Sequence, residues 1–303
     1  MSPSHGRGLW LMVVATFLWS TAGVVTRHLD HAQTFEVTFW RSLFAALAAA
    51  LLFQLRQGGS GWRRIPWQSP LYWGAAVCWS VMFTAFMVAL TITSTANVLA
   101  MLAAGPLVSA VMSTWVTGHR LPARTWWAIA LASLGILWMF GAKLALGEDR
   151  AALGMAIALL APFAGGAQWT IAQHSHMRGL EIDLVPSVMA GAFLSALVTA
   201  PLALPGVATA WDITALGLLG AFQLAVPSTL AVVASRVLKA AEMSLVGQLE
   251  IIFGVALAWL GANEVPGPNV LAGGAMVLVA LSINEALSMR GRQQARRANP
   301  QHG

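Results

Sequence analysis

Two ionisable residues lie deep inside long apolar segments, and they are the first candidates for chemistry. Glu250 is the eleventh residue of the apolar segment 240–262, and Arg41 lies seven residues into the segment 34–55. An ionised side chain at the centre of a membrane costs at least about 2.5 kcal/mol on insertion scales, so such residues usually have a function. A carboxylate suits the binding of a substrate amine or the transfer of a proton, and a planar guanidinium suits a substrate carboxylate. If both residues face one cavity, they hold the two ends of a zwitterion.

Each of the two residues also has a structural interpretation, which the sequence leaves open. Glu250 shares a helical face with three glycines, Gly247, Gly254 and Gly261. A face with so little side-chain bulk either packs closely against another helix or opens onto a cavity. Arg41 can instead pair with Glu36 or extend its long side chain to the membrane surface.

Uncharged residues at helical spacing within the apolar segments are further candidates for lining a substrate site. They are Trp19, Trp79, Asn97, Met101, Trp169, Gln173 and Gln223. Four Gly and Pro residues are candidates for helix breaks that gate such a site, because proline removes a backbone donor and leaves a carbonyl free. They are Gly105, Pro106, Pro162 and Pro227. Stripes of aromatic and Met residues are also typical of a packed core, so both interpretations stand.

The composition of the chain shows which solvent surrounds these residues. Of the 303 residues, 58% are hydrophobic and 9% are charged, against about 25% charged in a typical soluble domain. This excludes a soluble enzyme and a nucleic-acid-binding protein, because a soluble fold of this size cannot bury so much apolar surface. The single cysteine, Cys78, excludes an intrachain disulfide and a cysteine-based zinc site.

Ten apolar segments are each close to the length of about 20 residues that a membrane-spanning helix needs. They are Gly8–Thr26, Thr34–Leu55, Leu71–Leu90, Thr95–Thr117, Arg124–Ala142, Ala152–Gln173, Val185–Leu204, Ile213–Ser235, Ala240–Ala262 and Val270–Leu287. The predicted fold class is an all-α integral membrane protein with ten transmembrane helices.

The distribution of Lys and Arg predicts the orientation of these helices. With a cytoplasmic N-terminus, 13 of these residues lie in cytoplasmic segments and 3 lie outside, namely Arg27, Lys143 and Arg150. Basic residues accumulate on the cytoplasmic side of membrane proteins. We therefore expect both termini in the cytoplasm, a location in the cell inner membrane, and a disordered basic tail from Arg290.

The two halves of the chain show a weak internal repeat. A shift of 145 residues places Thr95–Ile136 on Ala240–Leu281 without a gap. Each half has five spans, and because five is odd the second half must enter the membrane from the opposite side. Inverted repeats of this kind are common in secondary transporters, whose substrate site lies between the halves near the midplane. The predicted organisation is a first five-helix repeat over residues 1–145, a second, inverted one over 146–289, and a basic tail over 290–303.

Short motifs in both halves resemble the EamA family of the drug/metabolite transporter superfamily, and the resemblance covers almost the whole chain. The motifs are Leu18–Thr21, Phe39–Leu43, Gly105-Pro106, Leu249-Glu250 and the turn Gly261–Glu264. The chain departs from the family pattern at two positions: Ile251 stands where proline is frequent, and His119 stands where glutamate is frequent. The resemblance implies a ten-helix transporter with a central cavity, and transport in the direction of export.

The sequence therefore predicts a secondary active transporter that exports a small metabolite, such as an amino acid, by alternating access. No nucleotide-binding or nucleophile motif occurs, so we expect no enzyme activity, no cofactor and no metal, with protons as the candidate coupling ion. The expected partners are the small-molecule substrate and the lipid bilayer, without nucleic acid, and the chain is expected to be a monomer or a homodimer. Two alternatives stay open: a proton-coupled exporter of drugs or hydrophobic cations, and a structural membrane protein that transports nothing.

Overall fold

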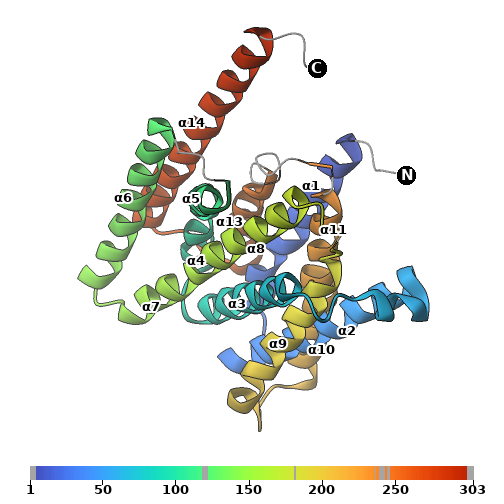
Figure 1. Cartoon of the computed structure of the whole chain (residues 1–303). Helices are drawn as coiled ribbons and strands as arrows, with labels where there is room; N and C mark the ends of the chain where they lie inside the picture. Colours follow the sequence, from blue (N-terminus) through green and yellow to red (C-terminus); the bar gives the residue numbers. More distant parts are fainter. Residues whose placement is uncertain are drawn as a thin grey trace.

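The protein is a bundle of helices (Figure 1). The computed structural model describes residues 5–117, 122–180, 182–235, 237–238, 243 and 246–298, and within these residues it contains helices and no strand. Helices are expected here because lipid offers no hydrogen bonds, so the backbone must satisfy its own polar groups.

The first half of the chain forms seven helical segments. They are α1 (His5–Thr26), α2 (Thr34–Gly61), the 3-10 helix η1 (Trp62–Arg64), α3 (Pro70–Ile92), α4 (Thr95–Leu102), α5 (Gly105–Thr117) and α6 (Ala123–Ala145). The second half contains α7 (Asp149–Ala158), α8 (Leu160–Met177), α9 (Val185–Ala203), α10 (Ala210–Leu218), the π-helical segment η2 (Leu219–Ala225), α11 (Val226–Ala234), α13 (Leu249–Ala262) and α14 (Pro268–Ala298).

The apolar segments of the sequence coincide with these helices. Within the described residues, eight helical stretches are long and apolar enough to cross a membrane, and two shorter apolar helices lie at Leu249–Ala262 and Pro268–Asn284. Several stretches combine consecutive elements, since α4 leads into α5, α7 into α8, and α10 through η2 into α11. The predicted all-α fold with ten apolar helices is confirmed.

Two helices, α2 and α14, extend furthest beyond the predicted spans. The span expected to end at Leu55 continues as helix to Gly61, with a kink at Gly58, whose φ of 65° lies in the left-handed region that glycine adopts readily. The tail expected to be disordered from Arg290 is helical through Ala298 as part of α14, so that prediction was wrong for these residues.

Helices from the two halves pack against each other throughout the bundle. α2 packs along α9, and α6 packs along α14. α1 contacts α13 and α11, while α8 contacts α5 and α3. The backbones of α6 and α14 meet at Gly135 and Gly273, where an added Cβ would collide with the opposite carbonyl oxygen. Such small residues allow the close helix approach that is typical of membrane proteins.

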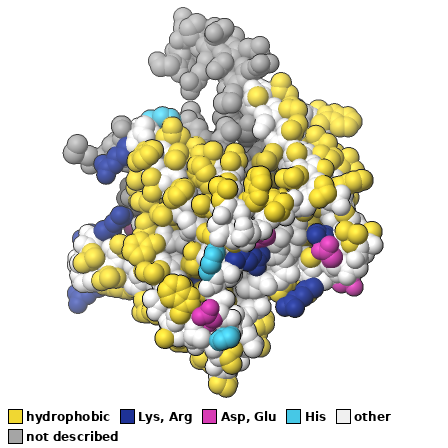
Figure 2. Space-filling view, turned by 180° about the vertical axis from the view of Figure 1, so that it is seen from behind, with side chains coloured by type: hydrophobic (Ala, Val, Ile, Leu, Met, Phe, Trp, Pro, Cys, Tyr) yellow, Lys and Arg dark blue, Asp and Glu magenta, His cyan; other side chains and the backbone are white. Residues whose placement is uncertain are grey.

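The outer surface of the bundle is strongly apolar. Figure 2 shows hydrophobic side chains over a broad band of one face, with the charged groups gathered mainly below and beside it. Among the exposed large side chains are Trp127, Leu55 and Leu260, which is 82% exposed. A surface of this kind fits lipid contact, because soluble monomers rarely expose broad contiguous apolar patches.

Candidate functional site

Arg41 lies on α2 with its side chain inside the bundle, where it is only 1% exposed. Its Nε donates a hydrogen bond to Oε1 of Gln223 at 2.9 Å, and its Nη1 donates to the carbonyl oxygen of Phe83 at 3.5 Å. The guanidinium carbon lies 5.9 Å from the centre of the Phe86 ring, which is within the range of a cation–π interaction. The guanidinium is therefore held by the protein itself and leaves no exposed surface for a substrate carboxylate.

Gln223 links Arg41 to α1 and uses both ends of its amide to do so. While Oε1 accepts from Arg41, Nε2 donates to the carbonyl oxygen of Trp19 at 3.0 Å. Gln223 is buried within η2, and π-helical turns often occur at functional sites. In the same segment, a Cβ on Gly220 would collide with the carbonyl oxygen of Arg41. η2 and α2 are thus in backbone contact at the height of Arg41.

Glu250 is the second residue of α13 and has a half-buried side chain. Among the described residues, its carboxylate has no hydrogen-bond or ion-pair partner. The opposite charge that acts on it is the guanidinium of Arg41, at a separation larger than the 4 Å of an ion pair. A carboxylate with free acceptor atoms inside an apolar bundle is suited to bind a proton or a cationic group.

The glycine face of α13 packs against other helices. A Cβ on Gly254 would collide with Leu99 of α4, and a Cβ on Gly261 would collide with Val24 of α1. At Gly247 the contact is looser, because the nearest atom, the terminal methyl of Met12, would lie 3.8 Å away. Of the two interpretations of this face, close packing is therefore the one observed at Gly254 and Gly261.

The structure does not place Arg41 and Glu250 at the two ends of one open site. Arg41 is enclosed by the protein and its guanidinium is held by protein acceptors, whereas Glu250 is half-buried and its carboxylate has no such partner among the described residues. The alternative pairing of Arg41 with Glu36 was also wrong. The carboxylate of Glu36 instead accepts hydrogen bonds from backbone N–H groups, those of Gln33, Val207 and Ala208.

The two deep tryptophans of α1 and α8 lie on the same hydrophobic cluster. Trp19 and Trp169 are both partly buried and both pack against the buried residues of that cluster, which are Met12, Ala231, Ala234, Leu238 and Met243. The structure thus brings these two candidates close to one set of residues. Their incomplete burial fits side chains that border an accessible space.

Three other predicted site residues lie in the packed core. Trp79 is stacked on Phe83 with 5.3 Å between ring centroids, and Met101 is completely buried. Asn97 is also buried and donates from Nδ2 to Oγ1 of Thr93 at 2.8 Å, while its Oδ1 has no partner. The side chain of Gln173 lies outside the described residues.

Gln168 was missed from the sequence, although it holds Trp79 in place. With its amide oriented to satisfy both neighbours, Gln168 accepts from Nε1 of Trp79 and donates to the carbonyl oxygen of Ala75, each at 3.2 Å. The available signal was its position next to Trp169 inside an apolar span, because a polar side chain there needs a hydrogen-bond partner.

The four Gly and Pro candidates all lie just after interruptions of their helices. Gly105 and Pro106 open α5, after the break that separates it from α4. Pro162 lies in the first turn of α8, directly after the break at Leu159, and Pro227 lies in the first turn of α11, directly after η2. Proline fits these positions because the first turn of a helix does not need its backbone N–H.

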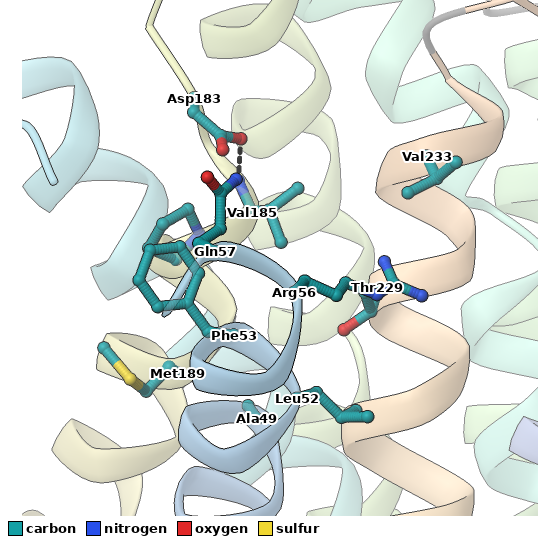
Figure 3. A pocket seen from close by; sticks show the side chains of 11 residues that line it. Ala49, Leu52, Phe53, Arg56, Gln57, Asp183, Val185, Met189, Thr229 and Val233 are labelled. Carbon is teal, nitrogen blue, oxygen red and sulfur yellow. Dashed lines mark hydrogen bonds between the residues drawn. The ribbon is translucent and has the colours of Figure 1, made fainter. Parts of the chain in front are cut away.

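A cavity of about 180 Å³ lies between α2, α9 and α11 (Figure 3). Arg56, Gln57 and Asp183 line it together with apolar side chains such as Phe53 and Met189. None of the predicted site residues belongs to its lining. Among the described residues, no group of three or more His, Cys, Asp or Glu side chains is arranged as metal ligands.

Comparison with known proteins finds a family that matches part of the chain. Residues 6–141 match the EamA-like transporter family, which consists of membrane transporters and not of enzymes. Fourteen chains of solved structures match the chain as well. One of them, described only as the crystal structure of a protein, has 18% sequence identity and a TM-score of 0.62, and the match covers 94% of this chain and 99% of that chain. This likeness shows the fold. No curated protein matches the sequence.

Proposed function

We propose that this chain, which over residues 6–141 belongs to the EamA-like transporter family, exports a small metabolite by alternating access with Glu250 in the transport path. The family makes the chain a multi-pass membrane transporter of the drug/metabolite type. The finer proposal is supported by one observation: Glu250 is a half-buried acidic residue inside the bundle, and its carboxylate has no hydrogen-bond partner among the described residues.

The proposed substrate is a small amine-bearing metabolite such as an amino acid. Its ammonium group binds Glu250, whose acceptor atoms are free, and protons that compete for the same carboxylate are the proposed coupling ion. A helix N-terminus that opens after a helix break supplies N–H groups for the substrate carboxylate, and a backbone carbonyl freed at such a break can accept from the ammonium group.

A second candidate, proton-coupled export of hydrophobic cations, is supported by the state of Arg41. Arg41 is only 1% exposed, and Gln223 and Phe83 accept hydrogen bonds from two of its nitrogen atoms. Without a free guanidinium, the transport path favours substrates with a positive charge and no carboxylate. Trp19 and Trp169, which border the same cluster, offer aromatic faces for such a cation.

The third part of the proposal is that the two halves of the chain are inverted repeats. The contact between α1 of the first half and α13 of the second has its counterpart in the contact between α8 of the second half and α5 of the first, as a two-fold relation between residues 1–145 and 146–289 requires. The start of α1 and the end of α14 lie on the same, upper side of Figure 1. This fits two cytoplasmic ends in an inner membrane.

A ligand panel followed by a flux assay tests the proposal. Purified protein is heated with single amino acids, simple amines and hydrophobic cations, and a compound that binds the folded state raises its melting temperature. The compound that stabilises the protein most is then assayed for flux in proteoliposomes, with Glu250→Gln beside the wild type. Glu148→Gln is the matched control, because Glu148 is an exposed glutamate in a connection between helices.

The two substrate classes give different results in this assay. Stabilisation and flux with amino acids support the first candidate, and flux with cations in exchange for protons supports the second. A protein that no compound stabilises, with no flux in proteoliposomes, contradicts both candidates and favours a structural membrane protein.

A further inference from the structure

Three carboxylates tie the two halves of the chain together at one end of the bundle. We call this end the carboxylate end; it is formed by the connections 27–33, 93–94, 204–209 and 263–267. Asp212 of α10 accepts hydrogen bonds from the backbone N–H groups of Asp30, His31 and Ala32 at 2.7–3.1 Å. Glu36 of α2 accepts from Val207 and Ala208 in the other half. Glu264, after α13, is the third.

Glu264 binds both a side chain and a helix terminus of the first half. Its Oε2 accepts from Nε of Arg27 at 3.1 Å and from Oγ1 of Thr95 at 2.8 Å, and its Oε1 accepts from the backbone N–H of Thr95. Thr95 is the first residue of α4, so the carboxylate also faces the positive end of that helix dipole. One carboxylate therefore joins α13, α1 and α4.

Arg27 extends the same connection to α3. Its Nη1 donates to the carbonyl oxygen of Leu90 at 2.9 Å, and its Nη2 donates to that of Thr93 at 2.7 Å. On the other side, α13 ends at Asn263, whose left-handed φ of 52° and the bond from the N–H of Glu264 to Ala258 turn the chain back over α13. Arg27 thus donates three hydrogen bonds here and Glu264 accepts three, and the bond between the two residues is common to both sets.

The helices beneath the Arg27–Glu264 pair are in close contact. A Cβ on Gly23 of α1 would collide with Thr95 of α4, and one on Gly261 of α13 would collide with Val24 of α1. The space between these three helices is therefore closed at the carboxylate end. A path along Glu250 can open at this end only when the three helices separate.

The Arg27–Glu264 pair differs from the other two carboxylates in a way that permits release. Asp212 and Glu36 are buried and bind backbone N–H groups of loops, which fixes the shape of those loops. The side chains of Arg27 and Glu264 are 28% and 16% exposed, so water can replace their contacts when they part. Breaking a partly exposed pair costs far less than exposing a buried one.

We propose that the Arg27–Glu264 pair is the latch that holds the carboxylate end closed, and that it breaks each time the transporter opens at that end. This inference rests on the proposed alternating access. It assigns to the pair a role in the conformational cycle that is separate from substrate binding at Glu250.

Thiol labelling on α1 tests the latch without a known substrate. In a Cys78→Ala background, Ser20→Cys places a reporter in a buried position near the carboxylate end, and Met12→Cys places one in a buried position near the other end of α1. Each reporter is combined with Arg27→Gln or with Glu264→Gln in the full-length protein. The labelling rate is measured with a hydrophilic maleimide in detergent.

We expect either neutral variant to raise the labelling rate at Ser20→Cys about fivefold, which is the effect of losing about 1 kcal/mol from the closed state. Labelling at Met12→Cys should fall or stay unchanged, because opening at one end closes the other. Thr95→Val, which removes only the hydroxyl donor to Glu264, should raise the rate at Ser20→Cys by about half that factor or less. Lys143→Gln is the matched control, since it breaks the 2.6 Å pair with Glu148 in the connection before α7 and should change neither rate.

Two results overturn the proposal. An unchanged rate at Ser20→Cys in both neutral variants means that the pair does not hold this end closed. A rise at Ser20→Cys and Met12→Cys together means that the variants loosen the whole bundle. A failure of the proposed function is visible separately, because it is measured as flux in Glu250→Gln and leaves these labelling rates unaffected.

Discussion

The surroundings of Arg41 and of Glu250 differ, although each is an ionisable residue inside the bundle. Arg41 is fully enclosed, with Gln223 and Phe83 as hydrogen-bond acceptors. Glu250 is half-buried, and no described residue bonds to its carboxylate. A buried charge stabilises a fold only when its partners compensate for the lost water, so Arg41 meets the requirement of a structural ion. Free acceptor atoms, rather than depth in the membrane, distinguish a group that can bind a transported ion or amine.

The largest effect is expected from removal of the enclosed charge. Arg41→Met leaves Gln223 and Phe83 without their donor and should lower the free energy of unfolding by about 3–5 kcal/mol, as for other broken buried interactions. Denaturation of the purified protein in mixed micelles measures this. Arg56→Met is the matched control on the same helix, where the exposed side chain predicts a change within about 0.5 kcal/mol. Equal stability of the two variants would show that Arg41 is not a structural ion.

Neutralising Glu250 should affect transport and not stability. Glu250→Gln keeps the shape of the side chain and removes its charge, so flux of the identified substrate should fall about 100-fold, or about 2.7 kcal/mol. The melting temperature should stay within a few degrees of the wild type, because no hydrogen bond to a described residue is lost. Flux at the wild-type level would remove Glu250 from the transport path.

Removal of the Gln223 amide, which bonds to both Arg41 and Trp19, should have an intermediate effect. Gln223→Leu deletes the acceptor for Arg41 and the donor to Trp19, and we expect a loss of about 1–3 kcal/mol in the free energy of unfolding. Gln57→Leu, at an exposed position of α2, is the control. A stability loss in Gln223→Leu that disappears when Arg41 is also replaced by Met would show that the amide acts through Arg41.

The smallest effect is expected at Trp19, one of the two tryptophans proposed to contact a cationic substrate. Trp19→Phe retains the backbone carbonyl that Gln223 uses, so the fold should be little changed. If an organic cation contacts this ring, its apparent affinity should fall several-fold, in line with a cation–π contribution of about 0.5–2 kcal/mol. Trp10→Phe on the exposed side of α1 should not change the affinity. Identical affinities in the two variants would place the cation away from Trp19.

Hydrophobic runs and proline positions predicted most of the fold. The apolar segments coincide with helices because lipid permits few alternatives, and Pro106, Pro162 and Pro227 all lie beside helix interruptions because proline cannot donate within a helix. The end of α2 was less predictable, since the kink at Gly58 depends on a backbone angle that several glycines in this stretch could have adopted.

The partners of the ionisable residues were not predictable, because they come from distant parts of the sequence. Gln223 is 182 positions from Arg41, and Glu264 is 237 positions from Arg27. Glu36 and Asp212 bind backbone N–H groups, which every residue except proline offers, so no side-chain pattern marks these contacts. Glu250 was recognised because it is the only acid in its apolar segment that lies near the centre, a signal that needs no partner.

The winding of η2 has a further consequence for the helix in which it lies. Regular α-helix before and after Leu219–Ala225 is joined by turns that hold more residues, so the angular phase of α11 does not continue that of α10. Gln223 lies within this segment, so the direction of its side chain toward Arg41 depends on the change of angular phase. Deleting one residue from this segment would return the chain to uniform winding, rotate α11 about its own axis, and turn Gln223 away from α2 while leaving the hydropathy of the span almost unaltered.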